Sequence, residues 1–128
     1  MEIVAFLPGI LGSELRTADN VKVWPPTVGE AIGELAAHKL AALLDETPLV
    51  APNAVEQVCL KQIYRGVLDE IEDAGFRRNG SDKRLVVLAY DWRLDIVDVI
   101  APTLAIELDR LVDGGVEKIR LVAHSMGG

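Results

Sequence analysis

Residues 118–128 (KIRLVAHSMGG) join an apolar segment of strand length to a serine motif at residues 123–127, AHSMG. A serine with small residues two positions before and after it is typical of a nucleophile on a sharp strand-to-helix turn, where larger side chains would collide with neighbouring backbone. We therefore predict that Ser125 is a catalytic nucleophile at a strand end. The same argument predicts that Ala123 and Gly127 are small for steric reasons.

Two other apolar segments, residues 3–7 (IVAFL) and 85–90 (LVVLAY), predict further buried strands. Amphipathic helical patterns occur at residues 63–71 and 97–112, and Gly75 is placed to cap the first of them. Strands that alternate with helices form parallel sheets with right-handed crossovers. The sequence therefore predicts an α/β fold with a parallel sheet of three strands.

Two residues modify the predicted helices. Pro102 lies inside the 97–112 pattern, and proline removes a backbone donor and clashes with the preceding turn, so we expect either a kink or a helix that begins near Pro102. Gly66 lies inside the 63–71 pattern, where glycine weakens a helix by up to about 1 kcal/mol. Its small size is expected to permit close packing on the sheet.

Residues 16 to about 60 interrupt the alternation of strands and helices and predict an insertion. Thr27 followed by Glu30 is a capping-box pattern, and the Ala- and Leu-rich sequence after it predicts a helix that ends at Leu44. Because the insertion directly follows the loop after the first strand, we expect it to lie over the serine as a cap or lid.

The loop after the first strand contains the sequence PGILG at residues 8–12. In serine acyl-transfer enzymes, one donor to the oxyanion is the backbone N–H of the residue after the nucleophile, and the other comes from a loop after an earlier strand. We therefore predict the N–H groups of Met126 and Ile10 as the two oxyanion donors. No cofactor and no metal site are predicted.

Composition limits the possible partners. The chain has 128 residues, 50% of them hydrophobic, and a net charge of −7, which predicts one globular domain or part of one and argues against a nucleic-acid-binding surface. A lipid ester would have to bind through apolar contacts.

The sequence contains no apolar run as long as a transmembrane segment, about 18 residues. Cys59 is the single cysteine and no signal-peptide pattern opens the chain, so we predict a cytoplasmic protein. The oligomeric state stays open.

Four blocks of the sequence together are similar to a known family. They are residues 7–15 (LPGILGSEL), 23–25 (VWP), 90–93 (YDWR) and 122–128 (VAHSMGG). In their order and rough spacing they resemble the lecithin:cholesterol acyltransferase family of α/β-hydrolases, in particular its small bacterial relatives. The resemblance implies an acyl-enzyme mechanism on lipid esters, with the serine and the two N–H donors in the roles given above.

The resemblance also implies where the remaining parts lie. The strand at residues 3–7 would be central, between the strands at 85–90 and 118–123. A triad acid and a histidine would follow further along, so residues 1–128 are expected to be the N-terminal portion of one α/β-hydrolase domain, with the C-terminal portion missing. Cys59 leaves no partner for the lid disulfide found in secreted animal members of the family.

Other polar and aromatic residues near these motifs have simpler interpretations. His124 is expected to pack beneath the turn and not to act as the base, because successive residues at a strand end point in opposite directions. Asp91 and Arg93 are expected to form a structural ion pair in preference to a substrate site. We expect His38 to be a surface or packing residue, Cys59 a buried hydrophobic residue, and Trp24 and Trp92 core or loop anchors, with Trp24 also able to contact an acyl chain from a lid.

Two functional hypotheses follow. The first is a serine-dependent acyl-ester hydrolase or O-acyltransferase that is incomplete as given and nearly inactive by itself, because loss of the triad histidine costs on the order of 10⁶ in rate. The alternative is a catalytically inactive chain that acts as a binding or interaction module. Neither the acyl donor nor the acceptor is defined by the sequence.

Overall fold

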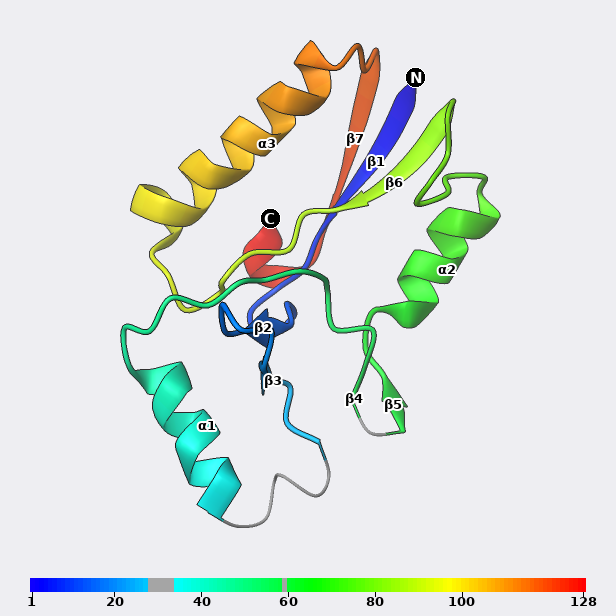
Figure 1. Ribbon diagram of the computed structural model, residues 1–128. Helices are drawn as coiled ribbons and strands as arrows, with labels where there is room; N and C mark the ends of the chain where they lie inside the picture. Colours follow the sequence, from blue (N-terminus) through cyan, green and yellow to red (C-terminus); the bar gives the residue numbers. More distant parts are fainter. Residues whose placement is uncertain (28–33, 59) are drawn as a thin grey trace.

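The computed structural model describes residues 1–27, 34–58 and 60–128. Its centre is a parallel sheet with the strand order β6-β1-β7, formed by Lys83–Val87, Glu2–Leu7 and Lys118–Ala123 (Figure 1). The predicted α/β fold with three parallel strands is confirmed. The strand nearest the N-terminus is the central one, as the family resemblance implied.

β6 has different limits from the strand predicted at residues 85–90. It begins at Lys83 and ends at Val87, and one further hydrogen bond to β1 follows it, from the Leu88 N–H to the Phe6 carbonyl. Beyond that point, the Tyr90 N–H donates to the Ser13 hydroxyl oxygen, 3.1 Å away. The chain therefore leaves the sheet after Leu88 and packs against the loop after β1. The apolar sequence continues to Tyr90 because this residue stays buried there.

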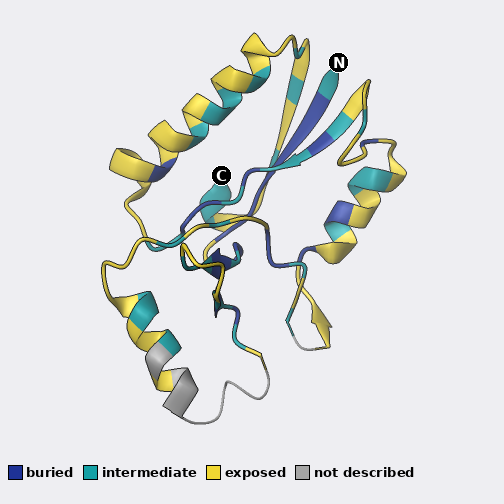
Figure 2. Ribbon diagram, in the orientation of Figure 1, coloured by how far each residue is buried: buried dark blue, intermediate teal, exposed yellow. Residues whose placement is uncertain are grey.

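β1 is covered on both faces, which explains its uninterrupted apolar sequence. Alternate residues of the strand belong to two clusters, one with α3 (Ala101–Asp113) and one with α2 (Arg65–Asp73). The first cluster contains Ile3, Ala5 and Leu7, and the second contains Val4 and Phe6. Figure 1 shows the two helices on opposite sides of the sheet, and Figure 2 shows β1 buried along most of its length.

α3 begins where Pro102 fits. A π-helical turn, Ile96–Ile100, precedes it, and the Asp95 carboxylate caps this turn by accepting two hydrogen bonds from backbone N–H groups. Pro102 lies in the first turn of α3, where a missing N–H costs no intrahelical hydrogen bond. Of the two outcomes predicted for Pro102, the helix that begins near it is confirmed. Within the described ranges, no helix is long and apolar enough to cross a membrane.

α2 ends near Gly75, as predicted. Gly75 has a φ of +97°, and its N–H donates to the Glu72 carbonyl, which is a common way for a helix to stop. Gly66, in contrast, is exposed, and a Cβ added there would meet no neighbouring atom within 4 Å. The expectation that Gly66 permits close packing on the sheet is therefore wrong.

The insertion consists of short elements. It contains an antiparallel pair, a helix and a small hairpin, namely β2 (Leu15–Arg16), β3 (Lys22–Trp24), α1 (Glu34–Leu44), β4 (Gln57–Val58) and β5 (Lys61–Gln62). α1 ends at Leu44 as predicted, and Glu30 of the capping-box pattern lies outside the described residues. The returning segment is tied to the loop after β1, because the Val55 N–H donates to the Gly12 carbonyl.

Replacing Gly66 with alanine is expected to stabilise the protein. The added methyl group enters open space in the first turn of α2, and replacing a glycine whose backbone conformation suits alanine stabilises a protein by about 0.4–1 kcal/mol. Urea denaturation followed by circular dichroism measures this change in the free energy of unfolding. Gly75→Ala is the control with the opposite sign, because its left-handed φ disfavours a Cβ. A destabilised Gly66→Ala protein would show that α2 requires glycine at this position.

Candidate active site

Ser125 lies on a sharp turn at the end of β7. His124 is still extended, with φ −123° and ψ 131°, whereas Ser125 has a φ of +55° and begins a short 3-10 turn, Ser125–Gly127. A left-handed φ costs a residue other than glycine about 1–3 kcal/mol. The turn is closed by a hydrogen bond from the Gly127 N–H to the His124 carbonyl, and Ser125 is exposed. The serine is therefore held in a strained and accessible conformation.

Two glycines allow this turn to pack against the loop after β1. A Cβ on Gly127 would lie 2.6 Å from the Leu7 carbonyl oxygen, and a Cβ on Gly9 would lie 2.9 Å from the Cβ of Ser125. Contacts this short with a backbone oxygen or with a Cβ atom exclude larger residues. The prediction that Gly127 must be small is thus explained by its contact with the Leu7 carbonyl oxygen. Ala123 is exposed at the end of β7.

The loop after β1 folds back on itself. The Gly12 N–H donates to the Gly9 carbonyl, 2.9 Å away, and Leu11 has a φ of +59° at the third position of the turn, as in a type II turn. A Cβ on Gly12 would lie 2.7 Å from that same carbonyl oxygen. Ile10, next to Gly9 in this turn, is 57% exposed.

The N–H groups of Ile10 and Met126 are unengaged. Neither donates a hydrogen bond to another residue in the described part of the chain. Because Gly9 contacts Ser125, the segments that carry these two N–H groups meet at the serine. To bind a developing oxyanion, a site needs hydrogen-bond donors that are fixed in place and have no protein acceptor. The structure therefore brings together the segments that carry all three predicted site residues.

Two tyrosine hydroxyl groups form hydrogen bonds with the backbone of the loop after β1. The Gly9 N–H donates to the Tyr64 hydroxyl oxygen, 2.9 Å away, and the Tyr90 hydroxyl donates to the Pro8 carbonyl, 2.6 Å away. Burial, and secondarily the nearby Tyr64, raises the pKa of Tyr90, so its hydroxyl keeps the proton that this hydrogen bond needs. The sequence analysis placed Tyr64 in a helical pattern and Tyr90 at a strand end, and it assigned neither tyrosine a role in the site.

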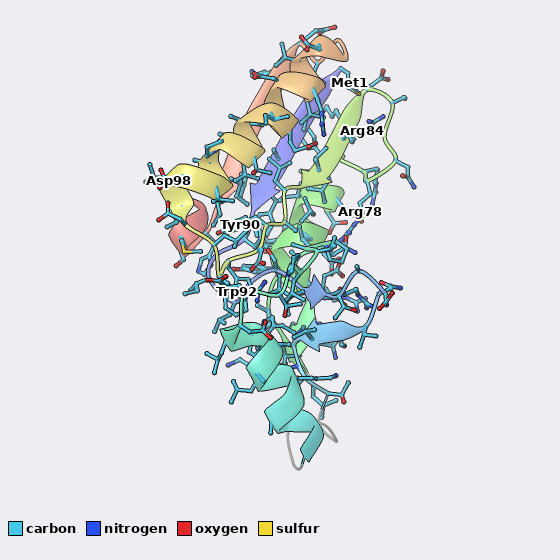
Figure 3. The ribbon with its side chains drawn as sticks, turned by 60° about the vertical axis from the view of Figure 1, so that its left-hand side comes forward. Met1, Arg78, Arg84, Tyr90, Trp92 and Asp98 are labelled. Carbon is cyan, nitrogen blue, oxygen red and sulfur yellow. The ribbon has the colours of Figure 1, made fainter. Side chains whose placement is uncertain are left out.

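Two tryptophans hold the far end of the loop. The Trp24 indole N–H donates to the Leu11 carbonyl, 2.9 Å away, and the Trp92 indole N–H donates to the Ser13 carbonyl, 3.1 Å away. The two rings pack edge to face with centroids 5.8 Å apart. Figure 3 shows Trp92 and Tyr90 close together on the segment that follows β6. Both tryptophans are thus loop anchors, which is one of the roles predicted for them.

His124 contacts Tyr64. Its ring packs edge to face on the tyrosine ring, with centroids 5.6 Å apart, and its Nδ1 lies 2.9 Å from the tyrosine hydroxyl oxygen. His124 nevertheless remains exposed, and its predicted place beneath the turn in preference to a role as base stays a prediction. The predictions for the His38 side chain and for Cys59 concern groups outside the described residues.

Asp91 and Arg93 form a largely buried ion pair. The Arg93 Nη2 lies 2.7 Å from the Asp91 Oδ2, and the two side chains are 11% and 6% exposed, respectively. Hydrogen bonding to Asp91 raises the pKa of Arg93. Arg93 also donates to the Ala42 carbonyl in the last turn of α1, 3.0 Å away, and to the Thr47 carbonyl in the segment after that helix, 2.9 Å away. The pair is therefore structural and joins α1 to the segment after β6.

This attachment bears on the predicted lid. α1 is fixed by Arg93 and contacts β3, while Ser125 remains exposed. The described part of the insertion thus leaves Ser125 exposed, and the position of the insertion over the serine stays a prediction.

Comparison with protein families matches residues 20–128 to the family described as lecithin:cholesterol acyltransferase. The matched region contains three of the four sequence blocks, at 23–25, 90–93 and 122–128, and the block at 7–15 precedes it. No curated protein and no solved structure matches the chain. The family match therefore rests on most of the chain and includes Ser125.

Replacing Arg93 with methionine is expected to destabilise the protein by about 3 kcal/mol, because it leaves the buried Asp91 carboxylate unpaired. Thermal and urea unfolding measure the loss. Arg110→Met is the matched control, since the Arg110–Glu107 pair is exposed and its removal should change the free energy of unfolding by less than about 0.5 kcal/mol. Similar losses in the two variants would contradict the structural role given to the Asp91–Arg93 pair.

Proposed function

This chain belongs to the lecithin:cholesterol acyltransferase family, and on that premise we propose that Ser125 is the nucleophile in a serine-dependent acyl transfer from lipid esters. The family itself indicates acyltransferase or lipid-ester hydrolase chemistry. The observation that supports Ser125 as the nucleophile is its left-handed turn, which packs against the loop that contains Gly9. The residues that follow Gly9 and Ser125, Ile10 and Met126, have unengaged N–H groups. An ordinary turn serine requires neither the strain nor the free donors.

In the proposed reaction, the Ser125 oxygen attacks the ester carbonyl carbon and the carbonyl oxygen becomes an oxyanion. The N–H groups of Ile10 and Met126 donate to that oxygen. The Ser125 proton passes to a general base and then to the departing alcohol as the ester C–O bond breaks, which leaves an acyl-enzyme. Water or an alcohol then attacks the acyl carbon, and Ser125 recovers its proton. Hydrolysis and acyl transfer differ only in this acceptor.

The general base and its acid partner are proposed to come from outside residues 1–128. No hydrogen bond joins the Ser125 hydroxyl to a histidine or carboxylate among the described residues. His124 already contacts Tyr64 through Nδ1, and its extended backbone directs it away from the side taken by Ser125. A lipid substrate would bind through apolar contacts, because the net charge of −7 gives no attraction to anionic lipid.

Fluorophosphonate labelling of the chain tests this proposal. Serine-triad enzymes that lack a triad member keep about 10³–10⁴-fold catalysis through the oxyanion hole and substrate binding. We therefore expect Ser125 to be phosphonylated on the order of 10³-fold faster than Ser81, which is exposed in the turn before β6. Intact mass and peptide mapping give both rates in one sample.

Ser125→Ala is the control and should remove the fast adduct while leaving slow labelling of Ser81. Circular dichroism shows that each sample is folded. Equal rates at Ser125 and Ser81 in the folded wild-type chain would contradict the nucleophile assignment. That result is the one expected of the alternative function, a catalytically inactive binding or interaction module.

A further inference from the structure

The Tyr64 hydroxyl joins the two segments of the candidate site. Its oxygen accepts a hydrogen bond from the Gly9 N–H, 2.9 Å away, and lies 2.9 Å from the His124 Nδ1. Gly9 directly precedes Ile10, and His124 directly precedes Ser125. One buried hydroxyl thus contacts the residue before a proposed oxyanion donor and the residue before the proposed nucleophile.

The hydrogen-bonding capacity of the hydroxyl defines the state of His124. A tyrosine hydroxyl has one hydrogen. Because the Gly9 N–H already donates to the oxygen, that hydrogen is available for the His124 Nδ1, which then accepts it while Nε2 carries the ring proton. With the other tautomer, the Tyr64 hydrogen would lose this acceptor, and an unsatisfied buried donor costs about 1–3 kcal/mol.

Tyr64 has little freedom to leave this position. It is 7% exposed and packs edge to face on Phe6 of β1, with ring centroids 5.1 Å apart. A Cβ on Gly12 would lie 2.8 Å from the Tyr64 hydroxyl oxygen, so the loop also fits closely around the ring. Tyr64 directly precedes α2, and the Leu68 N–H donates to its carbonyl in the first turn of that helix.

We propose that Tyr64 is a positioning residue, which locks the loop carrying Ile10 to the turn carrying Ser125 and holds His124 as its Nε2–H tautomer. The proposal rests on the proposed function of Ser125 for its effect on catalysis. The bridge itself is independent of that function, because it consists of two hydrogen bonds that can be observed directly. Tyr64 would act through Gly9 and His124 and does not touch the substrate.

Tyr64→Phe tests the bridge, because it keeps the ring that packs on Phe6 and removes only the hydroxyl. Hydrogen exchange of the Gly9 amide should become about 10-fold faster, which corresponds to the loss of one ordinary hydrogen bond. The ¹⁵N shifts of the His124 ring should change from the Nε2–H pattern to a tautomer mixture. Tyr90→Phe is the control for the His124 reading, since it removes a hydroxyl that contacts the same loop at Pro8 but does not contact His124, and it should leave the His124 tautomer unchanged.

Labelling tests the positioning role separately. We expect Tyr64→Phe to lower the ratio of Ser125 to Ser81 phosphonylation by about 10- to 100-fold, the loss that a small misplacement of reacting groups produces. Leu111→Val, in the cluster between α3 and the sheet, is the control for lost stability and should leave the ratio unchanged. Ser81 reports any general unfolding within the same sample.

The outcomes separate the two proposals. A faster Gly9 exchange, an altered His124 tautomer and a lower labelling ratio in Tyr64→Phe would support the positioning role. Unchanged Gly9 and His124 readings in Tyr64→Phe would overturn the bridge. If the wild-type chain labels at Ser125 and Tyr64→Phe has the same labelling ratio, the positioning role alone is overturned. A wild-type chain in which Ser125 reacts no faster than Ser81 would overturn the proposed function, and with it any role of Tyr64 in catalysis.

Discussion

The close contact between the loop after β1 and the turn after β7 is the constraint on which the rest of the site depends. β1 and β7 are adjacent parallel strands, so their carboxyl ends lie at the same edge of the sheet. Gly9 and Gly127 remove the Cβ atoms that would keep the two segments apart, at distances of 2.9 Å from the Ser125 Cβ and 2.6 Å from the Leu7 carbonyl oxygen. The left-handed Ser125 can therefore stand directly beside the loop that carries Ile10.

A loop held this closely needs partners for its backbone groups, because the sheet supplies none beyond the strand ends. Aromatic side chains from separate parts of the chain provide them: Tyr64 before α2, Trp24 in β3, and Tyr90 and Trp92 after β6. Each has an apolar ring for packing and one polar group for a hydrogen bond. The insertion and both crossovers thus serve the same loop.

Much of this arrangement could be predicted from local sequence. The apolar runs gave the three parallel strands, the helical periodicity and Pro102 gave the start of α3, and the family pattern gave the central position of β1. The predicted end of β6 at Tyr90 was wrong because apolar residues mark burial, whereas strand pairing stops when Tyr90 turns to Ser13. Gly66 was misjudged because a glycine within a helix has the same sequence signal whether it faces the sheet or the solvent. Tyr64 is separated along the chain from Gly9 by 55 positions and from His124 by 60. Contacts between residues so far apart have no signature in a single sequence.

The central claim is that the loop after β1 and the turn after β7 form one oxyanion-binding site at Ser125. The most direct measurement is a crystal structure of the chain with Ser125 phosphonylated. The account predicts that the phosphonyl oxygen accepts hydrogen bonds from both Ile10 and Met126 N–H groups, at about 2.7–3.1 Å. A phosphonyl oxygen that faces solvent, or an Ile10 N–H turned toward a protein acceptor, would contradict it.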